Sequence, residues 1–75
     1  MKTGDRVTLR GSATRTGEIV LCSENENSLM IRLDDGMPAA SGIYINFMAL
    51  LRTDGVYRDL IFGEPIEVEI ATAQG

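Results

Sequence analysis

The sequence predicts a small all-β barrel of five to seven short antiparallel strands, with one short helical turn near residues 46–50. Apolar and polar residues alternate with a period of two in several short segments, which is typical of strands with one buried face. Turn-forming Gly, Pro, Asn and Asp residues separate these segments. The 75 residues have room for one domain, and a single small sheet removes its exposed edges by curling on itself.

Three segments alternate clearly between apolar and polar residues, namely 6–10, 28–34 and 66–70. In the second segment the pattern predicts outward side chains at Met30 and Arg32 and inward ones at Leu29, Ile31 and Leu33. A fourth segment, residues 18–22, is apolar after its first residue, which predicts a strand covered on both faces. If the first and last strands are neighbours, we expect cross-strand ion pairs of Arg6 and Arg10 with Glu67 and Glu69.

The strongest turn signal is Asp54-Gly55, because both residues tolerate the positive φ of a type I′ turn. It predicts a hairpin that joins residues 51–53 to residues 56–58. Residues 46–50 fit either a strand or one turn of helix, since apolar residues recur there at three- and four-residue spacing. Residues 56–62 fit a strand or a short helix, and the flanking glycine turns favour the strand.

All 75 residues are expected to form one domain. We divide it into a barrel core (residues 4–53), a C-terminal two-strand extension (54–71) and a loose tail (72–75). The longest apolar runs are four or five residues, which predicts no membrane span. No apolar stretch follows Lys2, so we expect no secretory signal and a cytoplasmic protein.

The residue types that are missing restrict the possible chemistry. Without His the usual general base near neutral pH and imidazole metal ligands are absent. A lone Cys22 forms neither an internal disulfide nor a thiolate zinc site, and we expect it to pack as a small hydrophobe. The sequence also has no phosphate-binding glycine motif. We predict no catalytic residue, no metal site and no cofactor. The sequence does not decide whether the chain is an enzyme, and these absences favour a protein that is not one.

The formal net charge of −4 is unevenly distributed. Residues 1–15 hold four basic side chains and one acid, for a net of +3, while the remainder holds three arginines and ten acids, for −7. An acidic chain is poorly suited to nucleic-acid phosphates, so we expect no nucleic-acid partner. The basic and acidic segments either attract each other between two subunits or pair with each other within one sheet. The second interpretation is favoured because it needs no partner.

Four short blocks occur in the order and near the spacing of a known family: Gly4-Asp5-Arg6-Val7, Gly17 with Ile19-Val20, Ile43-Tyr44, and Leu50-Leu51-Arg52. The chain thereby resembles a Src-homology-3-like barrel and, within that fold, the type II dihydrofolate reductase carried by plasmids and integrons. The resemblance covers roughly residues 4–52. It implies a bacterial, cassette-borne origin and a homo-oligomer, because four copies of that family surround a central pore in which dihydrofolate and NADPH stack.

The same resemblance implies that Ile43 and Tyr44 position the ligand rings. The sequence departs from the family at three places. Gly42 stands where the family has a glutamine, Leu9 where a lysine holds the anionic ligands, and Arg15 where a tryptophan lies between subunits. These departures favour transfer of the fold rather than of the activity.

The function predicted from the sequence is a non-catalytic protein-interaction or small-ligand-binding barrel that self-associates. The candidate binding residues are Ile43, Tyr44, Asn46 and Tyr57. The alternative is a pore-type NADPH-dependent dihydrofolate reductase-like enzyme. A third hypothesis is a peptide-binding barrel that uses a strand edge or a groove beside the loop 35–42. Other methionine and aromatic residues fit either the core or an interface between subunits. We expect Phe47, Met48 and Phe62 to lie in the core.

Overall fold

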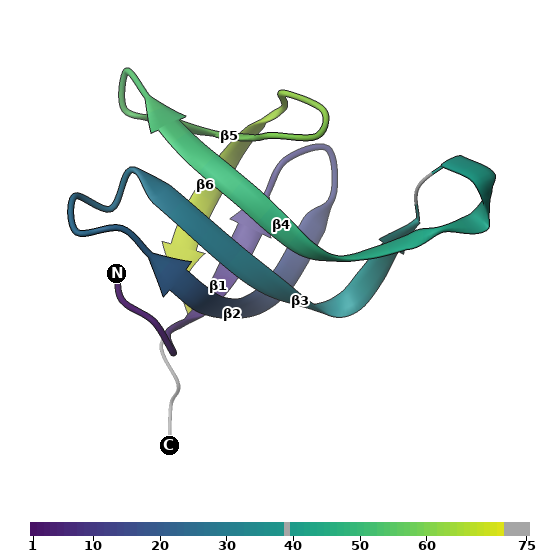
Figure 1. The fold of residues 1–75 in the computed structure, drawn as a ribbon, viewed down its shortest axis with the longest axis horizontal. Coiled ribbons are helices and arrows are strands. Elements are labelled where there is room, and N and C mark those ends of the chain that lie inside the picture. The colour runs from purple at the N-terminus through teal and green to yellow at the C-terminus, as the bar shows by residue number, and fades with distance from the viewer. Residues whose placement is uncertain (39, 72–75) are drawn as a thin grey trace.

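Six antiparallel strands form a closed barrel in the computed structural model, which describes residues 1–38 and 40–71 (Figure 1). They are β1 (Arg6–Arg10), β2 (Thr14–Cys22), β3 (Ser28–Pro38), β4 (Tyr44–Thr53), β5 (Val56–Asp59) and β6 (Pro65–Ile70). Each strand pairs with the next, and β6 pairs with β1 to close the sheet. The predicted all-β barrel is confirmed, and it is compatible with the Src-homology-3-like fold. The predicted loose tail, residues 72–75, lies outside the described residues.

The hairpin between β4 and β5 forms where the sequence predicts it. Thr53 pairs with Val56 across the turn. Asp54 and Gly55 both have positive φ, 56° and 79°. Two consecutive positive φ values are characteristic of a type I′ turn, which explains why Asp and Gly occupy these two positions.

The helical turn predicted near residues 46–50 is wrong, because these residues lie in the middle of β4. Residues 47–50 pair with β3 in regular register, with Met30 opposite Ala49 and Arg32 opposite Phe47, and the register shifts at Asn46. The apparent helical spacing came from counting apolar residues on both faces of one strand. The only 3₁₀ turn among the described residues is Ala40–Gly42, between β3 and β4. In the ambiguous segment, β5 ends at Asp59, and residues 60–62 form a turn.

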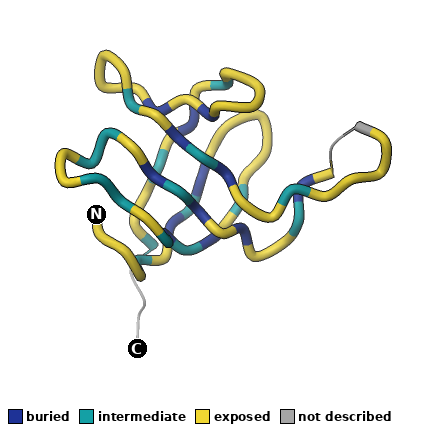
Figure 2. The backbone as a smooth tube through the Cα atoms, viewed as in Figure 1, coloured by how far each residue is buried: buried dark blue, intermediate teal, exposed yellow. Residues whose placement is uncertain are grey.

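The core consists of inward side chains from all six strands, and Figure 2 shows the buried positions spaced along them in dark blue. The predicted inward residues of β3 are confirmed as buried, namely Leu29, Ile31 and Leu33. Met48 is also buried, as predicted. Gly17 on β2 has no room for a side chain, because a Cβ there would lie 2.4 Å from the Arg32 carbonyl oxygen. Close packing between β2 and β3 therefore depends on this glycine.

The prediction that residues 18–22 are covered on both faces is wrong for Leu21, which is 65% exposed. A register shift between Ile19 and Leu21 leaves Val20 without a partner on β3. Such a bulge makes both Val20 and Leu21 depart from strict alternation. Leu21 faces outward opposite Met30, while Cys22 returns to the inner side and packs against the core as expected.

Basic side chains of the N-terminal segment pair with acids elsewhere in the barrel, which confirms pairing within the sheet. Arg10 contacts Glu69 on β6 at 3.2 Å, as the predicted strand neighbourhood implies. The Arg6 side chain pairs with β3 instead of with β6. Its guanidinium binds Asp34 on β3 in a bidentate pair, with Nη1 2.9 Å from Oδ1. Arg6 therefore reaches across β2 to β3, a partner that the expected pairing of the first and last strands did not indicate.

Within residues 1–38 and 40–71, no helix has the length and apolar character needed to cross a bilayer.

Candidate functional site

Three outward positions on neighbouring strands, continued by Leu60 directly after β5, form one apolar row across the barrel. Leu21 on β2 lies opposite Met30 on β3, and Met30 lies opposite Ala49 on β4. The row reaches the end of β5, where the Leu60 amide donates a hydrogen bond to the Ala49 carbonyl at 3.1 Å. Outward positions of a barrel with a wet exterior are usually polar. A continuous apolar row at such positions is therefore a candidate contact surface.

This row lies in an open groove of about 420 Å³, called here the outer groove. Its volume lies within the range of roughly 300–1,000 Å³ typical of sites that bury most of a small ligand. The ten lining residues include no charged side chain: Leu21, Cys22, Ser23, Ser28, Leu29, Met30, Ala49, Leu50, Leu51 and Leu60. Since Ala49 is the smallest side chain in the apolar row, the row dips at β4 between larger neighbours.

Polar and apolar side chains border the apolar row on both sides. On one side, Arg32 lies between Glu18 and Phe47 and contacts the Glu18 carboxylate at 2.6 Å. On the other side, Leu51 lies between Ser28 and Arg58.

The turn after β5 ends the row and is held by a buried carboxylate. Asp59 is 2% exposed, and its Oδ1 accepts hydrogen bonds from the amides of Ile61 at 2.8 Å and Phe62 at 2.6 Å. The Asp59 carbonyl accepts a hydrogen bond from the Gly63 amide, and the Asp59 amide donates one to the Glu64 carbonyl. We call residues 59–64 the Asp59 turn. Its side chains Leu60, Ile61 and Phe62 are all exposed.

Three of the four residues predicted to bind a ligand lie together, away from the outer groove. Ile43 and Tyr44 are 62% and 66% exposed on the hairpin that β3 and β4 extend beyond the barrel (Figure 1). Asn46 lies on the same hairpin, against the backbone of Gly36. The fourth residue, Tyr57, is a core residue and lies 7% exposed on β5. The structure therefore does not bring Tyr57 together with the other three.

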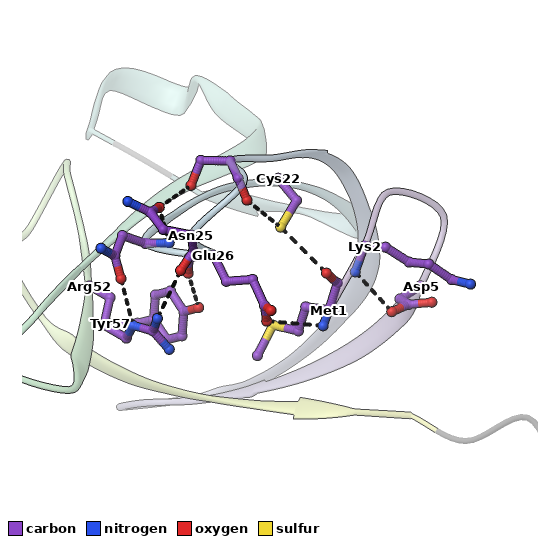
Figure 3. A network of polar contacts seen from close by, with 10 residues as sticks. Met1, Lys2, Asp5, Cys22, Asn25, Glu26, Arg52 and Tyr57 are labelled. Atoms are coloured by element: carbon purple, nitrogen blue, oxygen red, sulfur yellow. Dashed lines mark hydrogen bonds and ion pairs between the residues drawn. The ribbon is translucent and has the colours of Figure 1, made fainter.

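Tyr57 takes part in a polar network around the turn between β2 and β3 (Figure 3). Its hydroxyl donates a hydrogen bond to the Glu26 carbonyl, and burial raises the pKa of this phenol. Arg52 lies over the Tyr57 ring at 5.4 Å and donates from Nε to Asn27 at 2.9 Å. The Glu26 carboxylate accepts from the amine of Met1 at 3.0 Å. These contacts hold the turn against the barrel, which is a structural role.

The prediction that Phe47 and Phe62 fill the core is wrong, since both are exposed. Phe47 points outward because it alternates with buried Met48 on β4. Phe62 lies in the Asp59 turn. Sequence reasoning also missed Leu21 and Leu60 as surface residues. A signal was present in residues 18–22 and 47–51, where strands of a small barrel carry apolar residues at both inward and outward positions.

Several titratable side chains of the described residues form ion pairs between strands. The described residues hold no cluster of three or more His, Cys, Asp or Glu side chains arranged to bind a metal. The Arg6 guanidinium, followed by the Thr16 hydroxyl, lowers the pKa of Asp34 by hydrogen bonding to its carboxylate. This lowered pKa belongs to an exposed ion pair between strands.

The chain matches no protein-family model, no curated protein and no solved structure. The likeness to type II dihydrofolate reductase therefore rests on the four short sequence blocks and on the compatible barrel. Ile43 and Tyr44, which that likeness singles out, do not border the outer groove.

Proposed function

We propose that this chain is a non-catalytic interaction module that self-associates through the outer groove. The observation that carries the proposal is the apolar row of Leu21, Met30 and Ala49 on β2–β4, continued by Leu60 after β5. The barrel closes with the opposite faces of these strands, so its fold does not need the row. Burial of a large apolar side chain contributes about 1.5–3 kcal/mol, and a two-fold contact would bury the exposed Leu21 and Leu60 of both copies.

A second copy of the chain suits this surface for two reasons. Copies with a net charge of −4 repel one another, and the uncharged lining of the groove allows their closest approach with the least repulsion. The groove also adjoins the exposed apolar side chains of the Asp59 turn. One molecule thus carries both an apolar groove and exposed apolar side chains beside it. Two copies can bury these surfaces against each other.

Size-exclusion chromatography with light scattering over a concentration series tests the proposal. We expect the wild-type mass to rise above the 8.2 kDa of one chain as concentration increases. Leu21→Lys places a charge in the apolar row and is expected to weaken association by about tenfold or more. The matched control is Ile70→Lys, which changes an exposed apolar residue on β6 outside the groove and should leave the mass curve unchanged.

Circular dichroism and urea unfolding of each variant show whether the barrel remains folded. A wild-type chain that stays at 8.2 kDa up to millimolar concentration would overturn the proposal. Equal weakening by both variants would also overturn it, because a general charge effect would then explain the loss. Capture of another protein by the groove, without association of copies, would contradict self-association while leaving the surface an interaction site.

A further inference from the structure

We infer that the free edge of β4 at residues 44–48 accepts an extended peptide segment of another protein as an additional strand. The segment is apolar where it pairs with β4 and basic at its flanks. This surface is separate from the outer groove, whose lining includes Ala49 but none of residues 44–48. The inference therefore goes beyond the proposed self-association and does not depend on it.

The first half of β4 has a strand neighbour on one side only. That neighbour is β3. On the other side, pairing with β5 begins at Leu50, and one further hydrogen bond joins the Leu60 amide to the Ala49 carbonyl. Within the described part of the chain, no strand pairs with residues 44–48 on that side. Figure 1 shows this part of β4 leaving the barrel together with β3 as a two-stranded hairpin.

Backbone hydrogen bonds show which way the amides of β4 point. The Arg52 amide donates to the Asn27 carbonyl on the β3 side, whereas the Ala49 carbonyl accepts from Leu60 on the β5 side. Successive residues of an antiparallel strand direct their backbone groups alternately to its two neighbours. Phe47, two residues before Ala49, therefore directs its amide and carbonyl to the β5 side, where the described chain offers no strand. An unpaired amide and carbonyl on an extended strand bind the backbone of another extended strand.

The two edges of this hairpin differ in how they are protected against pairing. Beyond its last pair with β2, the β3 edge carries Asp34, Asp35 and Pro38. Charged residues and proline are common means by which proteins keep free edges from pairing. The β4 edge at residues 44–48 contains neither a charged residue nor a proline. An open edge beside a protected one favours strand addition at the open edge.

The side chains along the open edge favour an apolar segment. Phe47 and Tyr44 are 50% and 66% exposed, so an incoming strand can pack apolar side chains beside them. Leu60 occupies the position next to Ala49 and ends the free edge there. The paired stretch of the incoming strand is therefore limited to the length of residues 44–48.

Charge favours a partner with basic flanks over a second copy of the chain. Residues 34–49 contain two acids and no basic residue. Asp34 pairs with Arg6, while Asp35 has no ion-pair partner among the described residues. The β4 edge of a second copy brings the same acids and a net charge of −4. A peptide with lysines outside the paired stretch is attracted instead.

Hydrogen exchange measured by NMR tests the inference with a synthetic peptide. The probe is a Val-Thr-Val-Thr-Val segment with two lysines at each end, since backbone contacts tolerate many side chains. In the free chain the Phe47 amide should exchange about tenfold or more faster than the Met48 amide, which faces β3. Saturating peptide should slow exchange at Phe47 by about tenfold or more. An unprotected Phe47 amide at millimolar peptide would overturn the inference.

Two control peptides separate strand addition from other contacts. A peptide with N-methyl groups on alternate amides cannot form the backbone ladder and should give no protection at Phe47. Equal protection by this peptide would overturn strand addition. Replacing the four lysines with glutamates should weaken binding by about tenfold, and unchanged binding would contradict the basic flanks. Protection of Phe47 in the chain alone as its concentration rises would show pairing with a second copy and overturn the choice of partner.

Variants of β4 test the direction of the Phe47 amide. Phe47→Pro removes an amide that the inference leaves unpaired in the free chain, so the barrel should stay folded by circular dichroism while peptide binding falls by about tenfold or more. Phe47→Thr keeps the amide and should bind the peptide more tightly than Phe47→Pro. Met48→Pro is the matched control and should unfold the barrel, because its amide faces β3. Unfolding by Phe47→Pro, or equal binding by the two Phe47 variants, would contradict the free amide.

The failures of the two proposals are distinguishable. Leu21→Lys, which is expected to weaken self-association, should leave peptide protection of the Phe47 amide unchanged. Loss of peptide binding in this variant would contradict a separate surface. A chain that is monomeric but binds the peptide overturns the proposed function and leaves this inference standing.

Discussion

Leu50 and Leu51 are neighbours on β4, yet Leu50 is 1% exposed and Leu51 is 43% exposed. The same contrast runs through the two faces of β2–β4. The inner face carries the closed core, and the outer face carries apolar residues that meet water. Similar residue types thus have different tasks on the two faces. The inner residues are buried in the core, while Leu21 and Leu51 on the outer face remain exposed.

The outer surface nearer β1 shows that the exterior of this barrel accommodates polar residues. There Arg6 binds Asp34, and Arg10 contacts Glu69. Such ion pairs are what a wet strand face ordinarily carries. The apolar row over β2–β5 is therefore a property of one part of the surface and not a requirement of the fold, which is why it supports a binding function.

The largest expected effect separates the two leucines of β4. Leu50→Ala should lower the free energy of unfolding by about 2–5 kcal/mol, because it removes a buried side chain and leaves a cavity. Leu51→Ala should change it by no more than about 0.5 kcal/mol, because the side chain is exposed in the monomer. Urea unfolding at concentrations low enough to keep the chain monomeric measures both.

Light scattering at higher concentration measures how the Leu51→Ala variant self-associates. There Leu51→Ala should weaken self-association, since Leu51 lines the outer groove. A Leu51→Ala variant as unstable as Leu50→Ala at low concentration would contradict the distinction between the faces. It would mean that the outer leucine stabilises the barrel itself.

A smaller effect is expected at Tyr57, where the inner face includes a polar anchor. Tyr57→Phe keeps the ring in the core and removes the hydroxyl that donates to the Glu26 carbonyl. We expect the free energy of unfolding to fall by about 0.5–1.5 kcal/mol, with no change in self-association. Urea unfolding and light scattering together measure this. Weaker association of Tyr57→Phe would instead assign this residue a binding role, as the sequence suggested.

Much of the barrel was predictable because the inner face follows simple alternation. In β3 the inward positions of Leu29 and Ile31 follow directly from the pattern, and Asp54-Gly55 marks a turn with a specific backbone requirement. The outer groove was not predictable in the same way. In β4 apolar residues occur at both inward and outward positions, so the sequence has no period of two there and its apolar spacing also fits a helix.

Two further features depend on contacts that no local pattern encodes. The bulge at Val20 shifts Leu21 to the outer face, and a bulge is visible only once β2 is paired with β3. The Asp59 turn is shaped by a carboxylate that accepts from amides two and three residues ahead. Asp followed by three apolar residues gives no such signal in the sequence. These two features place Leu21 and Leu60 at the two ends of the apolar row.

The smallest effect on stability is expected on the charged side of the surface, at Asp34. Hydrogen bonds from Arg6, then from Thr16, lower the pKa of this carboxyl below its ordinary value. A lowered pKa in the folded state means that the ionised carboxylate stabilises the fold above the ordinary Asp pKa. That contribution is lost as the pH falls through the folded-state pKa. Since the pair is exposed, its effect on stability is small, and titration is the sensitive measurement.

Carbon-detected NMR titration of the Asp34 carboxyl should therefore give a midpoint below the ordinary Asp value. Arg6→Gln should raise that midpoint the most, and Thr16→Val should raise it less, in the order of their contributions. Arg10→Gln is the matched control, because Arg10 pairs with Glu69 and should leave Asp34 unchanged. A midpoint unaffected by Arg6→Gln would show that this side of the barrel is not held by the ion pair. The contrast between a charged exterior near β1 and an apolar exterior over β2–β5 would then lose its physical basis.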